Sequence, residues 1–234
     1  MPVCIAAGVN AVAVAETAIT LMLAIYKRLC VAHNSVRAGR WLKSELRTGC
    51  YELWQKTVGL IGGGAIGRAV AKRLSHGFEC TVLYYDVCRL PPETEKIHGM
   101  AYTTLEGLLR QSDIVSLHVP LLPETRGLIN ATTLALMKPT AVLINTARGG
   151  IVDEPALIEA LASGKIAAAG LDVFAKEPPD PDNPLLQMDN VVLTPHNGGG
   201  TVDTVKRIVG HAFANILRVE RGESLPAADR VKGT

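Results

Sequence analysis

The chain has 234 residues, of which 48% are apolar and 20% charged, a composition typical of a soluble globular protein. Its formal charge of +2 and its 4% aromatic content argue against a nucleic-acid partner. Five cysteines without C-x-x-C spacing indicate reduced thiols in a cytoplasmic protein, and we predict no metal site. No uncharged stretch is long enough to cross a bilayer, so we predict no contact with a membrane.

The N-terminal stretch 10–38 is rich in alanine, valine, leucine and isoleucine and is predicted to form one long helix. No basic residue precedes its apolar part, which is unlike a signal peptide. A helix that is apolar on most faces must be buried. We therefore expect a second copy of the chain to cover part of it, forming a homodimer. Residues 39–56 follow as a polar connector arm that carries Trp41 and Trp54.

Strands and helices alternate after this arm. The predicted strands are 57–61, 80–86, 100–102, 113–117, 141–145, 167–173 and 191–194. The predicted helices are 65–76, 105–111, 131–137, 154–163 and 201–222, and 90–98 is read as a loop because it contains two prolines. Thr104, Asn130 and Asp153 are predicted N-caps. Apolar strands alternating with amphipathic helices predict an α/β fold, a doubly wound parallel sheet with helices on both faces, over residues 57–200.

The turn after the first predicted strand reads Gly62-Gly63-Gly64-Ala65-Ile66-Gly67, which fits G-x-G-x-x-G. In such a turn Gly62 allows the sharp bend, Gly64 lets a pyrophosphate approach the backbone, and Gly67 lets the helix pack closely on the strand. The phosphates would lie on the free N–H groups at the start of the helix. We therefore predict a dinucleotide site at this turn.

A second apolar run ends in Asp86, nineteen residues after Gly67. An acidic side chain at this distance can accept hydrogen bonds from a ribose diol. A carboxylate also repels a 2′-phosphate, so the predicted cofactor is NAD, while nearby Arg89 leaves NADP open. The alternative is an ordinary glycine loop followed by a solvated strand end. The order of strand, turn, helix, strand and acid favours the dinucleotide site.

Ligands of doubly wound sheets bind beyond the carboxyl ends of the strands. Polar segments follow several of the predicted strands: His118-Val119-Pro120, Thr146-Ala147-Arg148, Lys176-Glu177 and His196-Asn197-Gly198-Gly199. An arginine offers a planar fork to a carboxylate, and a histidine can exchange a proton near neutral pH. A glutamate behind that histidine would orient it. Beside a nicotinamide, this set suits the interconversion of a 2-hydroxy acid and a 2-keto acid.

Each of these three residues also has an ordinary structural explanation. Arg148 alone could serve in an ion pair, Glu177 could be a loop charge before two prolines, and His196 could lie at the entry of a helix. The three together, downstream of a dinucleotide motif, favour the catalytic interpretation.

Taken together, these motifs make the chain similar to the D-isomer-specific 2-hydroxyacid dehydrogenase family. This family includes phosphoglycerate dehydrogenase and glyoxylate/hydroxypyruvate reductase. The matching motifs are GLIGGGAIGRAVAKRL, DIVSLHVPLLPETRGLIN, LINTARGGIVDEPALIEAL, AAAGLDVFAKEP and LTPHNGG. The resemblance implies that Arg148 holds the substrate carboxylate and carbonyl. It implies that Glu177 pairs with His196, and that His196 donates the proton when the keto acid is reduced.

The resemblance also implies a set of cofactor contacts. Backbone N–H groups of Ala65 and Ile66 would contact the pyrophosphate, and Asp86 the adenosine ribose. Asp172 would hold the nicotinamide carboxamide. The remaining residues expected along the cofactor are His118, Val119, Pro120, Thr146, Ala147, Gly198 and Gly199. Asn197 departs from the family, which often has an aliphatic residue there.

A second departure is at the N-terminus. The family places a substrate-binding domain before the long helix, but here only residues 1–8 precede it, and 225–234 has little left to dock on. We therefore expect one dinucleotide-binding domain over 1–234, with the substrate-binding domain mostly missing and weak or absent turnover. The competing interpretations are a non-catalytic NAD(H)-binding or dimerisation module, similar to a corepressor, and a fragment of a longer enzyme.

Overall fold

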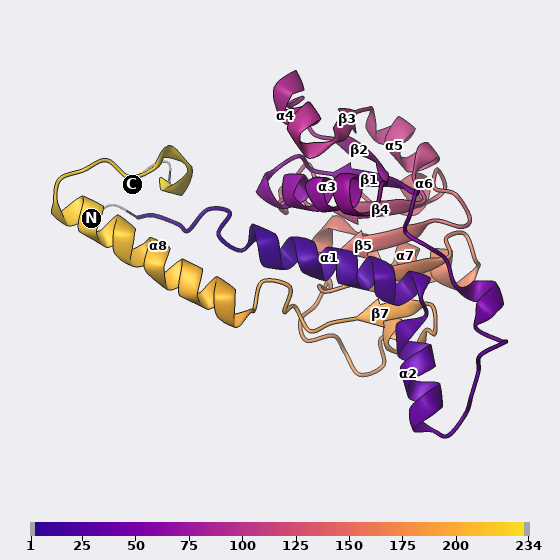
Figure 1. Cartoon of the computed structure of the whole chain (residues 1–234). Coiled ribbons are helices and arrows are strands. Elements are labelled where there is room, and N and C mark those ends of the chain that lie inside the picture. The colour runs from indigo at the N-terminus through magenta and orange to yellow at the C-terminus, as the bar shows by residue number, and fades with distance from the viewer. Residues whose placement is uncertain (1–2, 232–234) are drawn as a thin grey trace.

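The computed structural model describes residues 3–231 and contains one seven-stranded sheet (Figure 1). All neighbouring strands are parallel, and their spatial order is β3-β2-β1-β4-β5-β6-β7. The strands are β1 (Thr57–Ile61), β2 (Thr81–Tyr85), β3 (Met100–Tyr102), β4 (Ile114–Leu117), β5 (Val142–Asn145), β6 (Ala168–Leu171) and β7 (Val191–Leu193). The predicted doubly wound α/β fold is confirmed. The order of strands reverses between β1 and β4, where such sheets form a crevice.

Helices cover both faces of the sheet. One face is covered by α1 (Ala11–Tyr26) and α3 (Ala65–Gly77), with α4 (Pro92–His98) beside α3. The other face is covered by α5 (Leu105–Gln111), α6 (Ala131–Leu134) and α7 (Glu154–Ala162). Two further helices, α2 (Leu29–Arg37) and α8 (Val202–Glu220), extend away from the sheet (Figure 1). No helix within residues 3–231 combines the length and the apolar character that crossing a membrane requires.

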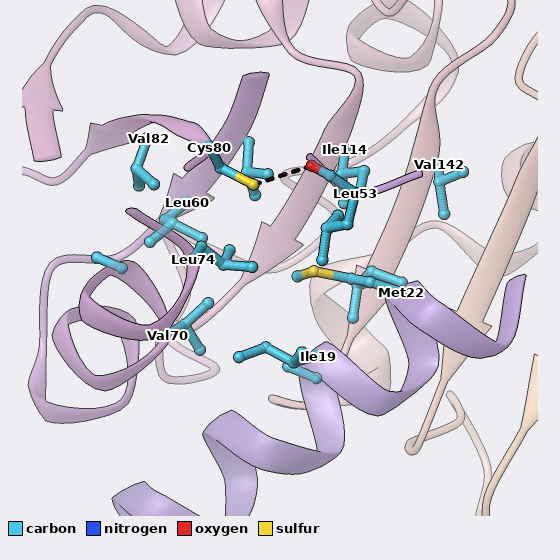
Figure 2. Packing of buried hydrophobic residues seen from close by; sticks show 14 of the residues in the cluster. Ile19, Met22, Leu53, Leu60, Val70, Leu74, Cys80, Val82, Ile114 and Val142 are labelled. Carbon is cyan, nitrogen blue, oxygen red and sulfur yellow. Dashed lines mark hydrogen bonds between the residues drawn. The ribbon is translucent and has the colours of Figure 1, made fainter. Parts of the chain in front are cut away.

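Figure 2 shows the core that α1 and α3 form with the sheet. Its labelled residues are Ile19, Met22, Leu53, Leu60, Val70, Leu74, Cys80, Val82, Ile114 and Val142. Cys80 Sγ donates a hydrogen bond to the carbonyl oxygen of Leu53 at 3.1 Å. Burial raises the pKa of the Cys80 thiol to about 11, so it stays protonated and packs as an apolar side chain. Leu53 thereby fixes the end of the connector to the core just before β1.

The turn between β1 and α3 requires glycine at two positions. Gly62 has a φ of +111°, and a Cβ added there would lie 2.6 Å from the carbonyl oxygen of His118. A Cβ added to Gly67 would lie 2.1 Å from the carbonyl oxygen of Gly62. The helix therefore packs as closely on the strand as the glycine motif predicts.

The predicted single helix over 10–38 is wrong, because the chain breaks at Arg28. This residue has a φ of +47°, which separates α1 from α2. The carbonyl groups at the end of α1 bond instead to the connector: Tyr51 N donates to Tyr26 O at 2.8 Å, and Cys50 Sγ donates to Lys27 O at 3.5 Å. The connector thus caps α1 where helix continuation was predicted.

This break changes which helix has apolar side chains left exposed to solvent. Ten of the sixteen residues of α1 are buried, and the sheet and α3 supply that burial within one chain. In α2 only Ser35 is buried. The burial of α1 therefore does not require a second copy, contrary to our expectation. Exposed apolar side chains lie mainly on α8, and others lie on α2 and the connector.

The loop predicted for 90–98 is also wrong, since residues Pro92–His98 form α4. Pro92 occupies the first turn, where its missing N–H has no helical partner to lose. The predicted helix 131–137 is shorter, ending at Leu134. The N-caps predicted at Thr104, Asn130 and Asp153 are confirmed, because each side chain accepts hydrogen bonds from the first turn of its helix.

The two ends of the described chain meet beside α8 (Figure 1). Cys4 forms an antiparallel bridge with Arg230, so the expectation that the C-terminal segment has little to dock on is wrong. Asp229 is 2% exposed and accepts hydrogen bonds from Asn215 Nδ2, Ala7 N and His211 Nε2 at 3.0, 3.1 and 2.6 Å. These hydrogen bonds hold the pKa of Asp229 below its usual value.

We expect Gly67→Ala to lower the free energy of unfolding by about 2–3 kcal/mol, because the new methyl group must push α3 away from β1. Gly77→Ala in the same helix is the control, since a Cβ there meets no atom within 4 Å. Urea unfolding of both variants measures the difference. A Gly67→Ala variant as stable as the Gly77→Ala variant would contradict the close contact.

Candidate active site

The predicted site residues gather at the carboxyl edge of the sheet. Gly62 follows β1, His118 follows β4, Thr146 follows β5 and Asp172 follows β6, and His196 lies shortly after β7. Because the strands are parallel and adjacent, these positions lie along one edge, as predicted.

His196 and Glu177 form a hydrogen-bonded pair at this edge. Nδ1 of His196 lies 2.6 Å from Oε2 of Glu177, and Oε1 of the same carboxylate accepts the N–H of Phe174 at 3.0 Å. Partial burial opposes ionisation of Glu177, but the bonds from His196 and Phe174 and the nearby charge of Arg148 hold its pKa below the usual value. The ionised carboxylate fixes the imidazole and leaves Nε2 without a hydrogen bond inside residues 3–231.

Asp172 holds the loop on which His196 lies. Its side chain is 1% exposed. It accepts hydrogen bonds from Thr194 Oγ1 at 2.6 Å, Asn197 N at 3.0 Å and Gly198 N at 2.8 Å. A carboxylate has about four acceptor positions, so one remains for a further donor. His196 has a φ of +52°, and these bonds on both sides stabilise that left-handed conformation.

Arg148 lies exposed at the end of β5. Its Nη1 donates to the carbonyl oxygen of Ala147 at 2.6 Å. The turn beneath it is held by Asn145, whose side chain accepts from Ala147 N and donates to Arg148 O, each at 3.0 Å. Asn145 is 1% exposed, and sequence reasoning did not single it out. In the sequence, Asn145 could have been recognised as the polar last residue of an otherwise aliphatic strand.

A second residue that sequence reasoning missed is Gly149. A Cβ added there would lie 1.9 Å from the carbonyl oxygen of Phe174, so the turn after β5 contacts the segment after β6 directly. This contact brings Arg148 toward the loop that carries Glu177. Arg148 and the pair of Glu177 and His196 therefore lie on loops at the same edge of the sheet.

The glycine turn has the features that a dinucleotide needs. No atom lies within 4 Å of a Cβ built on Gly64, and no side chain caps the start of α3, so its N–H groups are open to an anion. Asp86 Oδ2 accepts the N–H of Gly63 at 2.7 Å, which fixes the acid beside the turn. Thr146 Oγ1 is buried and has no hydrogen-bond partner within residues 3–231. A polar ligand at this edge would satisfy it.

His118 lies beneath the glycine turn. Its Nε2 is 2.9 Å from Oγ of Ser116. Burial lowers the pKa of His118 to about 4, so its ring is neutral at physiological pH. Val119 and Pro120 continue from it along the edge. The ring therefore supports the turn between β1 and α3 without adding charge.

Comparison with known proteins identifies the family to which this site geometry corresponds. Residues 19–198 match the family described as D-isomer specific 2-hydroxyacid dehydrogenase, NAD binding domain. A glyoxylate reductase of Thermofilum pendens is 48% identical over 223 residues, which cover 94% of this chain and 65% of the relative. The chain thus spans about two thirds of the length of that relative.

Solved structures show the same similarity. The apo form of Rhodotorula graminis D-mandelate dehydrogenase superposes with a TM-score of 0.93 at 32% identity, covering 99% of this chain and 69% of the other. The NAD-complexed D-isomer specific 2-hydroxyacid dehydrogenase of Lactobacillus delbrueckii ssp. bulgaricus gives a TM-score of 0.81 at 35% identity. That match covers 94% of this chain and 69% of the other.

Proposed function

This chain belongs to the D-isomer specific 2-hydroxyacid dehydrogenase family, and we propose that it transfers hydride between NAD and a small 2-hydroxy or 2-keto acid. NAD is the cofactor that the matched domain of this family binds. The observation that carries the proposal is the bond between His196 and Glu177 beside Arg148, at the edge that also holds the glycine turn.

The three residues have complementary roles in this proposal. The guanidinium of Arg148 binds the carboxylate of the acid in a fork geometry. Nε2 of His196 donates a proton to the carbonyl oxygen as the keto acid is reduced, and accepts it when the hydroxy acid is oxidised. Glu177, hydrogen-bonded to Nδ1, orients the imidazole for this exchange. The bound nicotinamide cofactor supplies or accepts the hydride.

The cofactor contacts form the second part of the proposal. Gly62, Gly64 and Gly67 shape the turn on which Ala65 N–H and Ile66 N–H hold the pyrophosphate. Asp86 binds the adenosine ribose. Asp172 uses its remaining acceptor position for the carboxamide of the nicotinamide. The residues proposed to line the rest of the cofactor are His118, Val119, Pro120, Thr146, Ala147, Gly198 and Gly199.

The substrate is proposed to be small, in the size class of the acid that names the glyoxylate reductase relative. Hydride transfer requires a cleft from which water is excluded. Arg148 is exposed, and the side chain of His196 is 47% exposed in this structure. We therefore propose that residues 1–234 act as the dinucleotide-binding unit, and that further protein surface covers this edge during turnover.

A homodimer in the cytoplasm completes the proposal. Exposed apolar side chains lie on α2 and the connector, among them Leu29, Val36 and Trp41, each more than half exposed. Surfaces of this kind are typical of protein interfaces. All five cysteines are free thiols, which is consistent with a reducing compartment.

Replacing His196 with glutamine is expected to lower kcat for keto-acid reduction by about 100-fold or more, because the proton donor is lost. NADH binding, followed by its fluorescence, should persist, since Asp86 and the glycine turn are intact. His33→Gln on the exposed face of α2 is the matched control. Near-normal turnover by His196→Gln would contradict the acid/base role. NADH binding without turnover of any small keto acid would favour a binding module only if it persists once the substrate edge is covered.

Replacing Asp86 with serine is expected to raise the Kd for NADH by about tenfold, because charge-assisted bonds to the ribose are lost. The preference for NADH over NADPH should fall in parallel, since the carboxylate no longer repels the 2′-phosphate. Thermal unfolding checks that the turn survives loss of the bond to Gly63. An unchanged ratio of the two affinities would remove Asp86 from cofactor choice.

We expect the chain to sediment as a dimer at micromolar concentration. Trp41→Lys should shift it toward the monomer mass, because Trp41 is 76% exposed on the connector. Val87→Lys is the control, since Val87 is 88% exposed but lies at the end of β2, away from α2 and the connector. A wild-type species of monomer mass at this concentration would refute the dimer.

A further inference from the structure

A cavity of about 570 Å³ lies at the amino-terminal edge of the sheet, opposite the edge that carries His196. The first residues of three strands, Val142, Ala168 and Val191, line it from the sheet side. Ile25 from α1 and Val31 from α2 line it from the helix side. Its volume falls within the range of pockets that bind small molecules, and its lining combines aliphatic with polar residues.

The phenol of Tyr26 lines this cavity and presents a hydroxyl donor to it. Tyr26 is 5% exposed, and its hydroxyl makes no hydrogen bond within residues 3–231. Its ring packs against Tyr51 with centroids 5.9 Å apart. Burial, reinforced by the negative charge of Asp113, raises the pKa of Tyr26, so the hydroxyl keeps its proton. The hydroxyl can therefore donate a hydrogen bond to an acceptor inside the cavity.

Arg28 brings an unpaired cation to the same cavity. Its left-handed conformation, φ +47°, breaks the helix and leaves the side chain half-buried. The side chain crosses Gly49, where an added Cβ would lie 3.3 Å from Cδ and Nη1 of Arg28. Across the described chain, its guanidinium forms neither an ion pair nor a hydrogen bond. Strained backbone of this kind is typical of functional positions.

The other charges around the cavity leave a net preference for an anion. Asp113 is already neutralised, since it accepts Lys138 Nζ at 2.7 Å and Thr57 N at 2.9 Å. Lys56 Nζ lies 5.9 Å from the ring centroid of Tyr51 and adds a second cation. The remaining acid, Asp189, is solvent-exposed at the rim, where water screens its charge.

We propose that this cavity binds a small apolar carboxylate, distinct from the acid that is reduced or oxidised at the other edge. Arg28 holds the carboxylate, and the Tyr26 hydroxyl donates a hydrogen bond to a polar atom of the ligand. The hydrocarbon part packs against Ile25, Val31 and Val142. Nothing in this assignment depends on hydride transfer.

The test uses 3-phenylpropanoate as the probe, titrated into the full chain by calorimetry. The wild type should show saturable binding. Arg28→Gln should weaken it by about tenfold or more, because the charge-assisted bond is lost. Arg37→Gln, the same change on the exposed end of α2, should leave it unchanged. Tyr26→Phe should weaken binding by about threefold without lowering the Tm, since the hydroxyl has no protein partner to lose.

Two results would overturn the proposal. One is a wild type that binds no probe saturably, which includes the case in which a second copy of the chain fills the cavity. The other is an Arg28→Gln variant with wild-type affinity, and loss of binding in Arg148→Gln would then place the probe at the opposite edge. His196→Gln should bind the probe normally, so failure here and failure of the proposed hydride transfer are separate outcomes.

Discussion

The carboxylate of Asp172 determines the geometry of the candidate site, because it holds the loop that carries His196. A buried carboxylate is costly to desolvate unless donors surround it. Three donors from a short segment, Thr194, Asn197 and Gly198, do so here. A Cβ on Gly198 would lie 2.8 Å from Asp172 Oδ2, so a side chain there would have to displace the carboxylate that holds the loop. The left-handed backbone at His196 follows from this arrangement.

Glu177, His196 and Arg148 depend on one another once Asp172 has fixed the loop that carries His196. Glu177 stays ionised because His196 and Phe174 donate to it, and its carboxylate fixes the orientation of the imidazole. Gly149 lets the turn after β5 touch the segment before Glu177, which brings the charge of Arg148 within reach. The proposed proton donor and carboxylate anchor therefore depend on backbone contacts between loops as much as on the side chains themselves.

The position of the site residues at this edge could be predicted from the sequence, because strands are recognised from short local patterns. Apolar runs identify parallel strands, and parallel strands place Arg148 and His196 at one edge whatever the loops do. The break at Arg28 could not be predicted, since it depends on donors from Cys50 and Tyr51 that are distant in sequence. The close contact of Gly149 with Phe174 could not be predicted either, because these two residues are also distant in sequence. The helix α4 was missed because a proline pair was read as a loop, although proline suits the first turn.

Helix α1 connects the two edges of the sheet. In its middle, Thr17 Oγ1 donates to the carbonyl oxygen of Gly198 at 3.2 Å, in the loop that Asp172 holds. At its end, Tyr26 lines the cavity at the amino-terminal edge. Nine residues separate them, or about 14 Å of helix, which is close to the length of a short strand. The apolar character of α1 thus has a physical reason within one chain: the helix spans the sheet and contributes a polar group at each edge.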